Sequence, residues 1–376
     1  MKIVFISEAT PFDKQIRSGV IYSIYNQLTK YYEVYWLKPK TGLCYILSIK
    51  IFIMLKRLLS VFGKEITVHN PLLSRLLCSD IQKQLRCIDY DAVFSLDCMN
   101  IAYLNINKPI YYRTDSSYPL LLNYYVFNTP KLFVKWGCEV EMQMLQRVTK
   151  IFSPSLWLNI GILKYFPTTD KNKLVLVESG ANIESNNINY RHNYCKSKPL
   201  NILFVGFDVK RKGIDIAYET LKELNNKYKI ESYLTIIGGK PDDNIIKDSS
   251  IIYVGRLNKN NPNDLLRLYN EYGKANLFLF PTKAECHGIV NCEAAAFGLP
   301  IFSYETGGVP SYVKNNYNGC VLPITAGGKE FAAKIAESIS SGIIKLYSEN
   351  SRRLYIERFN WDKWGETVYS IIGNNI

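Results

Sequence analysis

Short apolar runs alternate with amphipathic stretches along most of the chain. The run 2–7 predicts a β-strand, and a polar loop and the helical pattern Val20–Leu28 follow it. The same order returns with the apolar run 201–206, a second polar loop and the helical pattern Ile214–Leu224. A strand, a glycine-bearing turn and a helix are typical of the first unit of a Rossmann-like domain. The pattern therefore predicts an α/β protein with two such domains.

A further apolar run, Ala275–Phe280, predicts a buried strand that stops at Pro281. The pattern after it predicts a helix that opens near Gly288 and closes at 298–300, where glycine and proline act as stop signals. The predicted strand, loop and helix form one compact element.

Two glutamates lie on either side of this helix start, Glu285 on the loop and Glu293 on the second helical turn. Carboxylates accept hydrogen bonds from sugar hydroxyls, and the free N–H groups of a helix start bind phosphate. The element therefore suits a nucleotide sugar. On spacing alone an ordinary buried strand-loop-helix unit with two solvent-exposed glutamates remains equally open.

In the first half, the predicted strand 109–112 runs into the polar segment 113–117. Ligands of parallel α/β sheets gather at the carboxyl ends of strands, so Asp115 is placed to face a binding site. Its alternative role is an ordinary helix N-cap. In the second half, the loop 206–213 holds three consecutive cations, which would neutralise a diphosphate, and its alternative is a solvated basic loop.

Residues 38–64 contain six basic side chains and no acidic one, in a mostly apolar setting. Lys50, Arg57 and Lys64 recur every seven residues, which on a helix gives a narrow basic stripe beside a wide apolar face. A membrane-spanning helix would bury several cations at a cost of about 2.5 to 3.5 kcal/mol each. A helix lying in the membrane interface is favoured instead, and a mostly buried helix of the first domain is equally compatible.

Composition is consistent with a globular protein. A length of 376 residues suggests two domains, and 47% hydrophobic with 21% charged residues argues against long disordered tails. The nine cysteines form no Cys-x-x-Cys pair, so neither zinc nor a disulfide framework is expected. The turn at 241–243 is the one aspartate pair considered for magnesium, and it is interpreted as structural. No signal peptide opens the chain, so we expect a cytoplasmic protein.

The stretch 281–300 resembles the signature of retaining glycosyltransferases of family 4 (glycosyl transferases group 1), and 305–310 with 318–319 match the same pattern. The resemblance implies the GT-B fold: two Rossmann-like, doubly wound parallel-sheet domains that face each other across a cleft. It implies that Glu285 touches the transferred sugar and that Glu293 binds the ribose. His287 stands where the family usually has an aromatic residue.

Further site residues follow from the same resemblance. The donor site is expected to include Gly206, Arg211 and Lys212 on the basic loop, Arg256 beside the base, and His287, Gly288, Ile289 and Val290 at the helix start. Phe207 stands in place of a usual arginine, whose charge Arg211 would supply. Ser18 and Gly19 resemble the loop that approaches the donor phosphate from the opposite domain. Asp115 resembles the aspartate that a branch of the family carries near the reaction centre.

The domains expected are an acceptor-side domain at 1–184, a linker at 185–199, a donor-binding domain at 200–356 and a final helix at 357–376 that crosses back. The resemblance implies transfer from a UDP- or GDP-sugar, without a metal ion or other cofactor, to a lipid-linked or polysaccharide acceptor at the cytoplasmic membrane face. The segment 43–64 would touch anionic lipid.

Two other functions stay open. One is a sugar-nucleotide epimerase or hydrolase of the same fold. The other is a nucleic-acid-binding protein using the net charge of +13, which the apolar setting of 38–64 disfavours. The sequence identifies neither the sugar nor the base.

Overall fold

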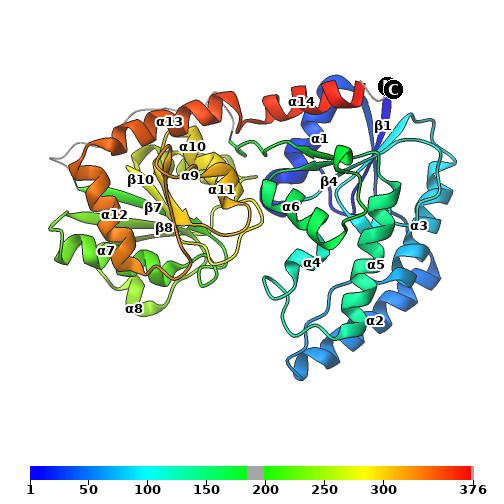
Figure 1. The fold of residues 1–376 in the computed structure, drawn as a ribbon, viewed down its shortest axis with the longest axis horizontal. Coiled ribbons are helices and arrows are strands. Elements are labelled where there is room, and N and C mark those ends of the chain that lie inside the picture. Colours follow the sequence, from blue (N-terminus) through cyan, green and yellow to red (C-terminus); the bar gives the residue numbers. More distant parts are fainter. Residues whose placement is uncertain (184–198, 374–376) are drawn as a thin grey trace. The chain divides into compact units, whose positions relative to one another are not determined.

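The computed structural model describes residues 1–183 and 199–373, which separate into two compact units. The first unit consists of Met1–Ile16, Val20–Val177 and the chain from Thr367 onward. The second consists of Arg17–Gly19 and Glu178–Glu366. Figure 1 shows the elements of both units. The predicted linker at 185–199 lies outside the described residues except for Pro199.

The first unit is built on a six-stranded, wholly parallel sheet in the order β2-β1-β3-β4-β5-β6. Its strands are β1 (Lys2–Ile6), β2 (Glu33–Leu37), β3 (Ala92–Ser95), β4 (Ile110–Arg113), β5 (Lys150–Ser153) and β6 (Leu174–Leu176). The order reverses direction between β1 and β3, because β2 lies on one side of β1 and the later strands lie on the other.

Helices connect these strands, as a parallel sheet requires. They are η1 (Ile16–Gly19), of which all but Ile16 cluster with the second unit, α1 (Val20–Tyr31), α2 (Leu43–Val61), α3 (Pro71–Leu85), η2 (Cys98–Asn100), α4 (Tyr118–Leu121), α5 (Lys131–Arg147), α6 (Leu156–Tyr165) and η3 (Lys171–Lys173). The predicted helical pattern 20–28 is confirmed by α1, and the helix expected within 43–64 is confirmed by α2.

The second unit holds another six-stranded parallel sheet, in the order β9-β8-β7-β10-β11-β12. Its strands are β7 (Leu200–Gly206), β8 (Ser232–Gly238), β9 (Ile251–Gly255), β10 (Leu277–Phe280), β11 (Ile301–Tyr304) and β12 (Gly319–Leu322). Within this unit the order is 3-2-1-4-5-6, the arrangement of nucleotide-binding Rossmann sheets. Its reversal point lies between β7 and β10.

The helices of the second unit include the two that the sequence pattern predicts, α7 and α10. The set is α7 (Ile214–Asn226), α8 (Asp243–Ile246), α9 (Pro262–Lys274), α10 (Ile289–Ala296), α11 (Val309–Tyr312), α12 (Gly328–Ser340), α13 (Ile343–Glu357) and α14 (Trp361–Gly373). Residues of α14 from Thr367 onward cluster with the first unit.

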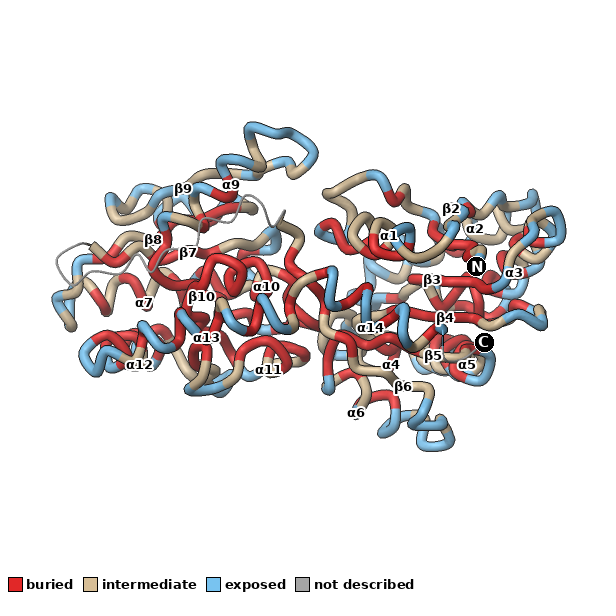
Figure 2. Tube along the Cα trace, turned by 90° about the horizontal axis from the view of Figure 1, so that it is seen from above, coloured by how far each residue is buried: buried red, intermediate tan, exposed pale blue. Residues whose placement is uncertain are grey.

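The second sheet is buried on both faces because alternate side chains of its strands point to opposite sides. On β10, Leu277 and Leu279 enter one apolar cluster, which α7, α12 and α13 complete. Phe278 and Phe280 enter the other, which α9, α10 and α11 complete. Figure 2 shows these strands buried while exposed positions gather on the helices and loops. Such a scaffold holds the loops at the strand ends in fixed places.

The first unit has a core of its own, in which β1, β3, β4 and β5 contact α2, α3, α5 and α6. Its other sheet face carries a row of stacked rings, Phe5, Phe94 and Phe152, with centroids 6.1 and 6.0 Å apart. Among the described residues, no helix combines the length and the apolar character needed to cross a bilayer.

Candidate functional site

The predicted donor residues of the second unit gather at the reversal point of its sheet. Strands β7 and β10 are hydrogen-bonded neighbours and parallel, so the loops that follow them leave the same edge of the sheet. The first loop carries residues 206–213, and the second carries 281–288. In open α/β sheets this is the place where ligands bind.

The start of α10 is shaped by Gly288, its N-cap residue. Gly288 has a positive φ of 73°, in the left-handed region that favours glycine. A Cβ at this position would lie 2.7 Å from the Nδ2 atom of Asn291 and 3.1 Å from Cγ of Glu285. Because residue 288 is a glycine, no side chain of this residue covers the backbone at the helix start. The helix ends at Ala296, just before Gly298, so both predicted boundaries are confirmed.

Glu285 is buried and forms an ion pair with Lys212. The two side chains are 11% and 13% exposed, and the Lys212 ammonium also lies 4.7 Å from the centroid of the Phe280 ring. Burial lowers the pKa of Lys212, and the nearby Glu285 charge opposes that shift. Gly206 makes room for the lysine, because a Cβ there would lie 2.9 Å from Cγ of Lys212. The predicted catalytic carboxylate and diphosphate lysine are thus direct partners.

Glu293 is also buried, with 1% of its surface exposed, and each of its carboxylate oxygens has a partner. The Lys259 ammonium donates to Oε1 at 2.5 Å, and the Tyr272 hydroxyl donates to Oε2 at 3.0 Å. Burial raises the pKa of Tyr272 well above its ordinary value, so the phenol keeps the proton that it donates. The carboxylate predicted to bind ribose is held in one orientation by a lysine and a tyrosine.

Neither Lys259 nor Tyr272 was found by sequence reasoning. Lys259 lies on the polar loop between β9 and α9, and Tyr272 lies on the inner face of α9. The only sequence signal is a lysine in the loop that already holds Arg256. Nothing in the local pattern connects that loop to a glutamate 34 residues later.

The two predicted arginines have different surroundings. Arg211 connects the two loops, because its Nε donates to Asp208 at 3.1 Å and its Nη1 donates to the carbonyl of Ala284 at 2.7 Å. The Arg256 guanidinium lies 4.3 Å from the ring centroid of Phe207, which is 61% exposed. Arg256 therefore places its charge against Phe207, the position where the resemblance predicts an arginine.

The loop 285–288 is supported from the neighbouring strand β11. The N–H of Gly308 donates to the carbonyl of Glu285 at 3.0 Å. A Cβ at Gly308 would lie 1.9 Å from the carbonyl oxygen of Cys286, so only glycine allows this approach. His287 is buried, with its ring centroid 6.3 Å from that of Tyr312. Along α10, Ile289 is buried and Val290 is half-buried.

Ser18 and Gly19 lie in a turn with an unusual backbone. Arg17, Ser18 and Gly19 have positive φ angles of 48°, 57° and 88°, and the first two are not glycine. These residues cluster with the second unit, where the carbonyl of Ser18 accepts a hydrogen bond from the side chain of Asn182. Strained turns of this kind concentrate at functional sites.

Asp115 belongs to the first unit and lies half-buried in the loop after β4. The N-cap of the following helix α4 is Ser117, so Asp115 does not fill the capping role that the sequence left open. Glu141 of α5 lies next to this loop, at Ser117 and Tyr118. Its carboxyl is fully buried, and burial raises the pKa of Glu141 to about 7. Hydrogen bonds from Ser117 and from the backbone of Tyr118 oppose that shift. Sequence reasoning did not find Glu141.

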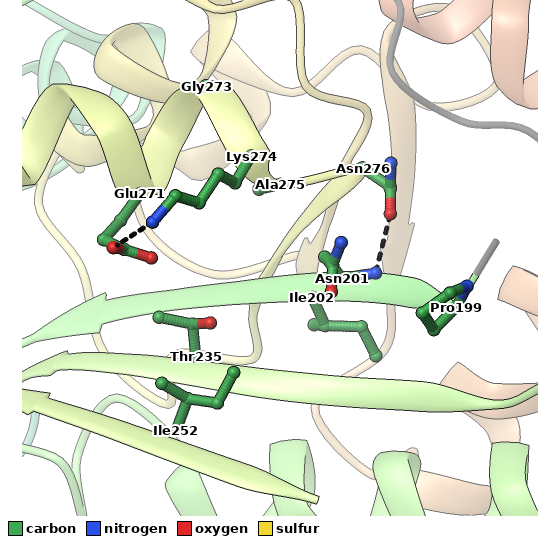
Figure 3. A pocket seen from close by; sticks show the side chains of 10 residues that line it. All are labelled: Pro199, Asn201, Ile202, Thr235, Ile252, Glu271, Gly273, Lys274, Ala275 and Asn276. Atoms are coloured by element: carbon green, nitrogen blue, oxygen red, sulfur yellow. Dashed lines mark hydrogen bonds and ion pairs between the residues drawn. The ribbon is translucent and has the colours of Figure 1, made fainter.

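One cavity of the second unit lies elsewhere and contains none of the predicted site residues (Figure 3). Most of the residues that line it lie at the start of β7 and where α9 leads into β10. Across it, the N–H of Asn201 donates to Asn276 at 2.6 Å, and Lys274 pairs with Glu271 at 2.9 Å. Within residues 1–183 and 199–373, no group of three or more His, Cys, Asp or Glu side chains could hold a metal ion.

Comparison with known proteins finds a family match in the second half of the chain. Residues 190–357 match the family model of glycosyl transferases group 1. An uncharacterized glycosyltransferase of Methanocaldococcus jannaschii is 23% identical over 194 residues, 51% of each chain. The capsular polysaccharide biosynthesis glycosyltransferase CapM of Staphylococcus aureus is 25% identical over 50% of each chain. The aligned part thus spans about half the length of these curated relatives.

Solved structures resemble the whole chain. HepE of Anabaena, in complex with UDP and glucose, has a TM-score of 0.68 at 13% identity and covers 100% of both chains. WaaG, a glycosyltransferase involved in lipopolysaccharide biosynthesis, has a TM-score of 0.66 at 15% identity over 98% of this chain and 99% of WaaG. At this identity the likeness concerns the fold. The predicted fold of two Rossmann-like parallel-sheet domains, the GT-B fold, is confirmed.

Proposed function

We propose that the protein is a retaining family 4 glycosyltransferase that moves a sugar from a nucleotide-diphosphate sugar to a lipid-linked or polysaccharide acceptor at the cytoplasmic membrane face. The observation that carries the proposal is the pair of buried ion pairs at the reversal point of the second sheet, Lys212–Glu285 and Lys259–Glu293. Two carboxylates offer acceptors to hydroxyl groups, and two ammonium groups offer charge to phosphates. A nucleotide-diphosphate sugar carries both kinds of group in one molecule.

The donor would lie along the loops after β7 and β10. Glu293 would accept hydrogen bonds from the ribose, while Lys212 and backbone N–H groups at the start of α10 would hold the diphosphate. Glu285 would orient the transferred sugar and stabilise its developing positive charge. The match to glycosyl transferases group 1 covers all of these residues. HepE, whose structures hold UDP and UDP-glucose, supports a uridine donor over a guanosine donor.

The proposed reaction proceeds at one face of the sugar. The bond from the anomeric carbon to the leaving phosphate oxygen breaks, and a bond from the acceptor oxygen forms on the same face. The leaving phosphate takes the acceptor proton, so no carboxylate forms a covalent bond to the sugar. Asp115 would act from the acceptor side of the reaction centre. The mechanism invokes no metal ion, because Lys212 and the helix amides would stabilise the phosphate charge.

The acceptor class is proposed from the relatives and from the first unit. CapM acts in capsular polysaccharide biosynthesis and WaaG in lipopolysaccharide biosynthesis, by their names. The basic, apolar segment 43–64 fits a location at an anionic membrane surface, because anionic lipid attracts lysine and arginine.

A thermal-shift panel of UDP-, GDP-, ADP- and dTDP-sugars tests the donor site. We expect one nucleotide class to raise the melting temperature, since a ligand at 100 times its dissociation constant adds about 2.7 kcal/mol of stability. Glu293→Ala is expected to abolish the response, and Glu293→Gln to reduce it strongly while keeping the side-chain volume. Glu337→Ala, which breaks a surface pair with Lys334, is the matched control and should respond like the wild type.

Two results would refute the donor assignment: no nucleotide stabilises the protein, or Glu293→Gln responds fully. Turnover distinguishes the alternatives of the same fold. An enzyme that consumes the stabilising nucleotide sugar at full rate without any acceptor would be an epimerase or a hydrolase instead.

A further inference from the structure

Helix α2 contacts the rest of the first unit through one face only. Phe52 is the one buried residue of α2, and the centroid of its ring lies 6.1 Å from that of Phe133 of α5. Tyr45, Ile49, Leu55 and Leu59 pack beside it against the same core. In Figure 1, α3 and α5 lie next to α2. These residues recur every three or four positions, so they form one helical stripe and account for the stability of the helix.

A second apolar stripe runs along the opposite face of α2, and the described part of the unit leaves it uncovered. Its side chains also recur every three or four positions, and each is between 57% and 80% exposed. We call this set the outer stripe; it consists of Leu43, Leu47, Ile51, Met54, Leu58 and Val61. Phe62, just beyond the helix, is 70% exposed and extends it. A contiguous exposed apolar row of this length marks an interaction surface on a folded protein.

The chemistry around the outer stripe indicates what covers it. Lys50 and Arg57 flank it on one side, and Lys56 and Lys64 are exposed on the same segment. Within the described residues none of these four forms an ion pair, and residues 38–64 contain no acidic side chain. Their charges are therefore available to an external anion. A polar face that is only basic, beside a row of aliphatic side chains, is the pattern of helices that lie in the interface of anionic bilayers.

We propose that the outer stripe of α2 is the membrane-docking surface of this protein and that it inserts among the acyl chains of an anionic lipid bilayer. The helix would lie parallel to the bilayer plane, with Leu47, Met54 and Leu58 below the headgroups and Lys50 and Arg57 against lipid phosphates. The stripe that contains Phe52 would stay on the protein core. One helix thus serves both surfaces, which explains why its sequence is apolar nearly all the way round.

A second copy of the chain is a poorer occupant. Two outer stripes packed against each other would place the basic flanks of both copies at one interface, with no acidic residue of 38–64 to balance them. The net charge of +13 on each chain adds to that repulsion. An anionic bilayer offers acyl chains to the outer stripe and phosphate groups to the basic residues beside it.

The proposal deepens the proposed function, because it identifies the surface that would bring the enzyme to a lipid-linked acceptor. The docking proposal and the proposed function can be refuted independently. Lipid binding is measured without nucleotide, and the nucleotide-induced thermal shift is measured without lipid. Loss of the nucleotide response with intact lipid binding would refute the donor site alone.

Vesicle flotation of the full chain tests the surface. Vesicles of phosphatidylcholine alone are compared with vesicles that contain about 30% phosphatidylglycerol, at low and high salt. The stripe variant is Leu47→Ser with Met54→Ser and Leu58→Ser, and the charge variant is Lys50→Ser with Arg57→Ser and Lys64→Ser. The matched control changes three exposed aliphatic residues on other helices: Ile160→Ser, Leu346→Ser and Ile356→Ser.

We expect the wild type and the control to bind anionic vesicles at least about tenfold more tightly than neutral ones. The stripe variant should lose about tenfold in affinity for anionic vesicles, and the charge variant should lose most of its preference for anionic vesicles and most of its salt dependence. Wild-type affinity of the stripe variant for anionic vesicles would overturn the proposal. A wild-type dimer in sedimentation that the stripe variant loses, without vesicle binding, would also overturn it in favour of a second copy.

Discussion

At the residue scale, Glu293 is an acidic side chain that is buried away from solvent. Its carboxylate is almost fully buried, and Lys259 and Tyr272 together supply a counter-charge and a second hydrogen bond. A buried ion pair adds little net stability, but removing one partner leaves an uncompensated charge. Lys259 is therefore a positioning residue of the proposed donor site: it holds the carboxylate in one orientation.

We expect Lys259→Met to lower the free energy of unfolding by about 3 kcal/mol, because it strands the buried carboxylate. Nucleotide binding by this variant should weaken, because the carboxylate loses the ammonium group that fixes its orientation. Titration calorimetry and chemical denaturation measure the two effects.

Lys334→Met is the matched control, because Lys334 pairs with Glu337 on the surface. Surface pairs contribute about 1 kcal/mol or less, so this variant should lose little stability and should bind nucleotide like the wild type. Similar results for the two variants would contradict a positioning role for Lys259.

Glu141 gives a prediction on the pH dependence of stability. Its pKa is about 7 in the folded protein and near 4.5 in the unfolded chain, so the folded state holds the proton more tightly. Stability from this group is then present below pH 4.5 and is lost as the pH rises toward 7, by roughly 3 kcal/mol in total. Glu141→Gln should be more stable than the wild type at pH 8 and about equal to it at pH 4.5, as measured by chemical denaturation.

Glu139→Gln on the same helix is its control, since Glu139 is partly exposed and pairs with Arg75. It should gain no stability at pH 8. If the difference in unfolding free energy between the wild type and Glu141→Gln is the same at pH 5 and pH 8, the Glu141 carboxyl is not buried in solution.

Only some of the site residues could be predicted from sequence. Glu285, Glu293 and Lys212 stand in recognisable motifs, and the structure brings the first and last of them into contact. Lys259, Tyr272 and Glu141 were missed because their partners lie far along the chain. The stacking of Arg256 on Phe207 likewise joins two strand ends that only the folded sheet brings together. The catalytic and binding roles of these residues stay predictions.

At the element scale, the loop that carries Glu285 and His287 depends on its neighbour after β11. Gly308 approaches the backbone of Cys286 so closely that any side chain would displace the loop, and its N–H holds the carbonyl of Glu285. The glycine-rich segment 305–308 therefore acts as a support for the carboxylate rather than as a flexible turn.

Gly308→Ala is expected to push the loop 285–287 away and to lower the free energy of unfolding by roughly 2 kcal/mol. Glycosyl transfer should fall further than stability explains, because Glu285 moves with its own carbonyl. Thermal denaturation and turnover of the nucleotide sugar measure the two effects.

Gly273→Ala is the matched control, because a Cβ at Gly273 in α9 meets nothing within 4 Å. A helical glycine replaced by alanine gains up to about 1 kcal/mol. Unchanged activity in Gly308→Ala would show that the support is not needed.

Element boundaries were predicted well where glycine and proline interrupt the pattern. The helix α10 begins after Gly288 and ends before Gly298, as the glycine positions predict, and α1 and α7 match their helical patterns. The packing of α2 could not be predicted in the same way. Its sequence is apolar on both faces, so periodicity alone does not say which stripe contacts the core.

At the scale of the whole molecule, each unit has its own apolar core and its own parallel sheet. One core joins residues between Val4 and Ile162, and two others join residues between Ala181 and Phe359. The proposed nucleotide contacts all belong to the second unit, while Asp115 and α2 belong to the first. Ligand binding should therefore affect the two units unequally.

Hydrogen exchange with and without the stabilising nucleotide measures this difference. We expect slower exchange at the start of α10 and in the loops after β7 and β10, because binding lowers the population of open states there. Amides of α2 and α3 should change little under the same conditions. Protection of equal size in α2 would contradict a donor site confined to the second unit.

The α/β class and the presence of two Rossmann-like domains could be predicted from the chain, because strand and helix patterns alternate and the first pattern repeats. The strand orders could not, since pairing such as β7 with β10 joins segments that lie far apart in sequence. The short strand β6 carries too little pattern to be recognised. The linker expected at 185–199 falls almost wholly outside the described residues.

The two lysine–glutamate pairs have one more consequence. At each pair the carboxylate and the ammonium group already neutralise each other. A free sugar would bring no anion for the ammonium groups, and inorganic phosphate would bring few hydroxyl groups for the carboxylates. The proposed donor carries both hydroxyls and phosphates in one molecule, so we expect it to bind more tightly than either of these fragments.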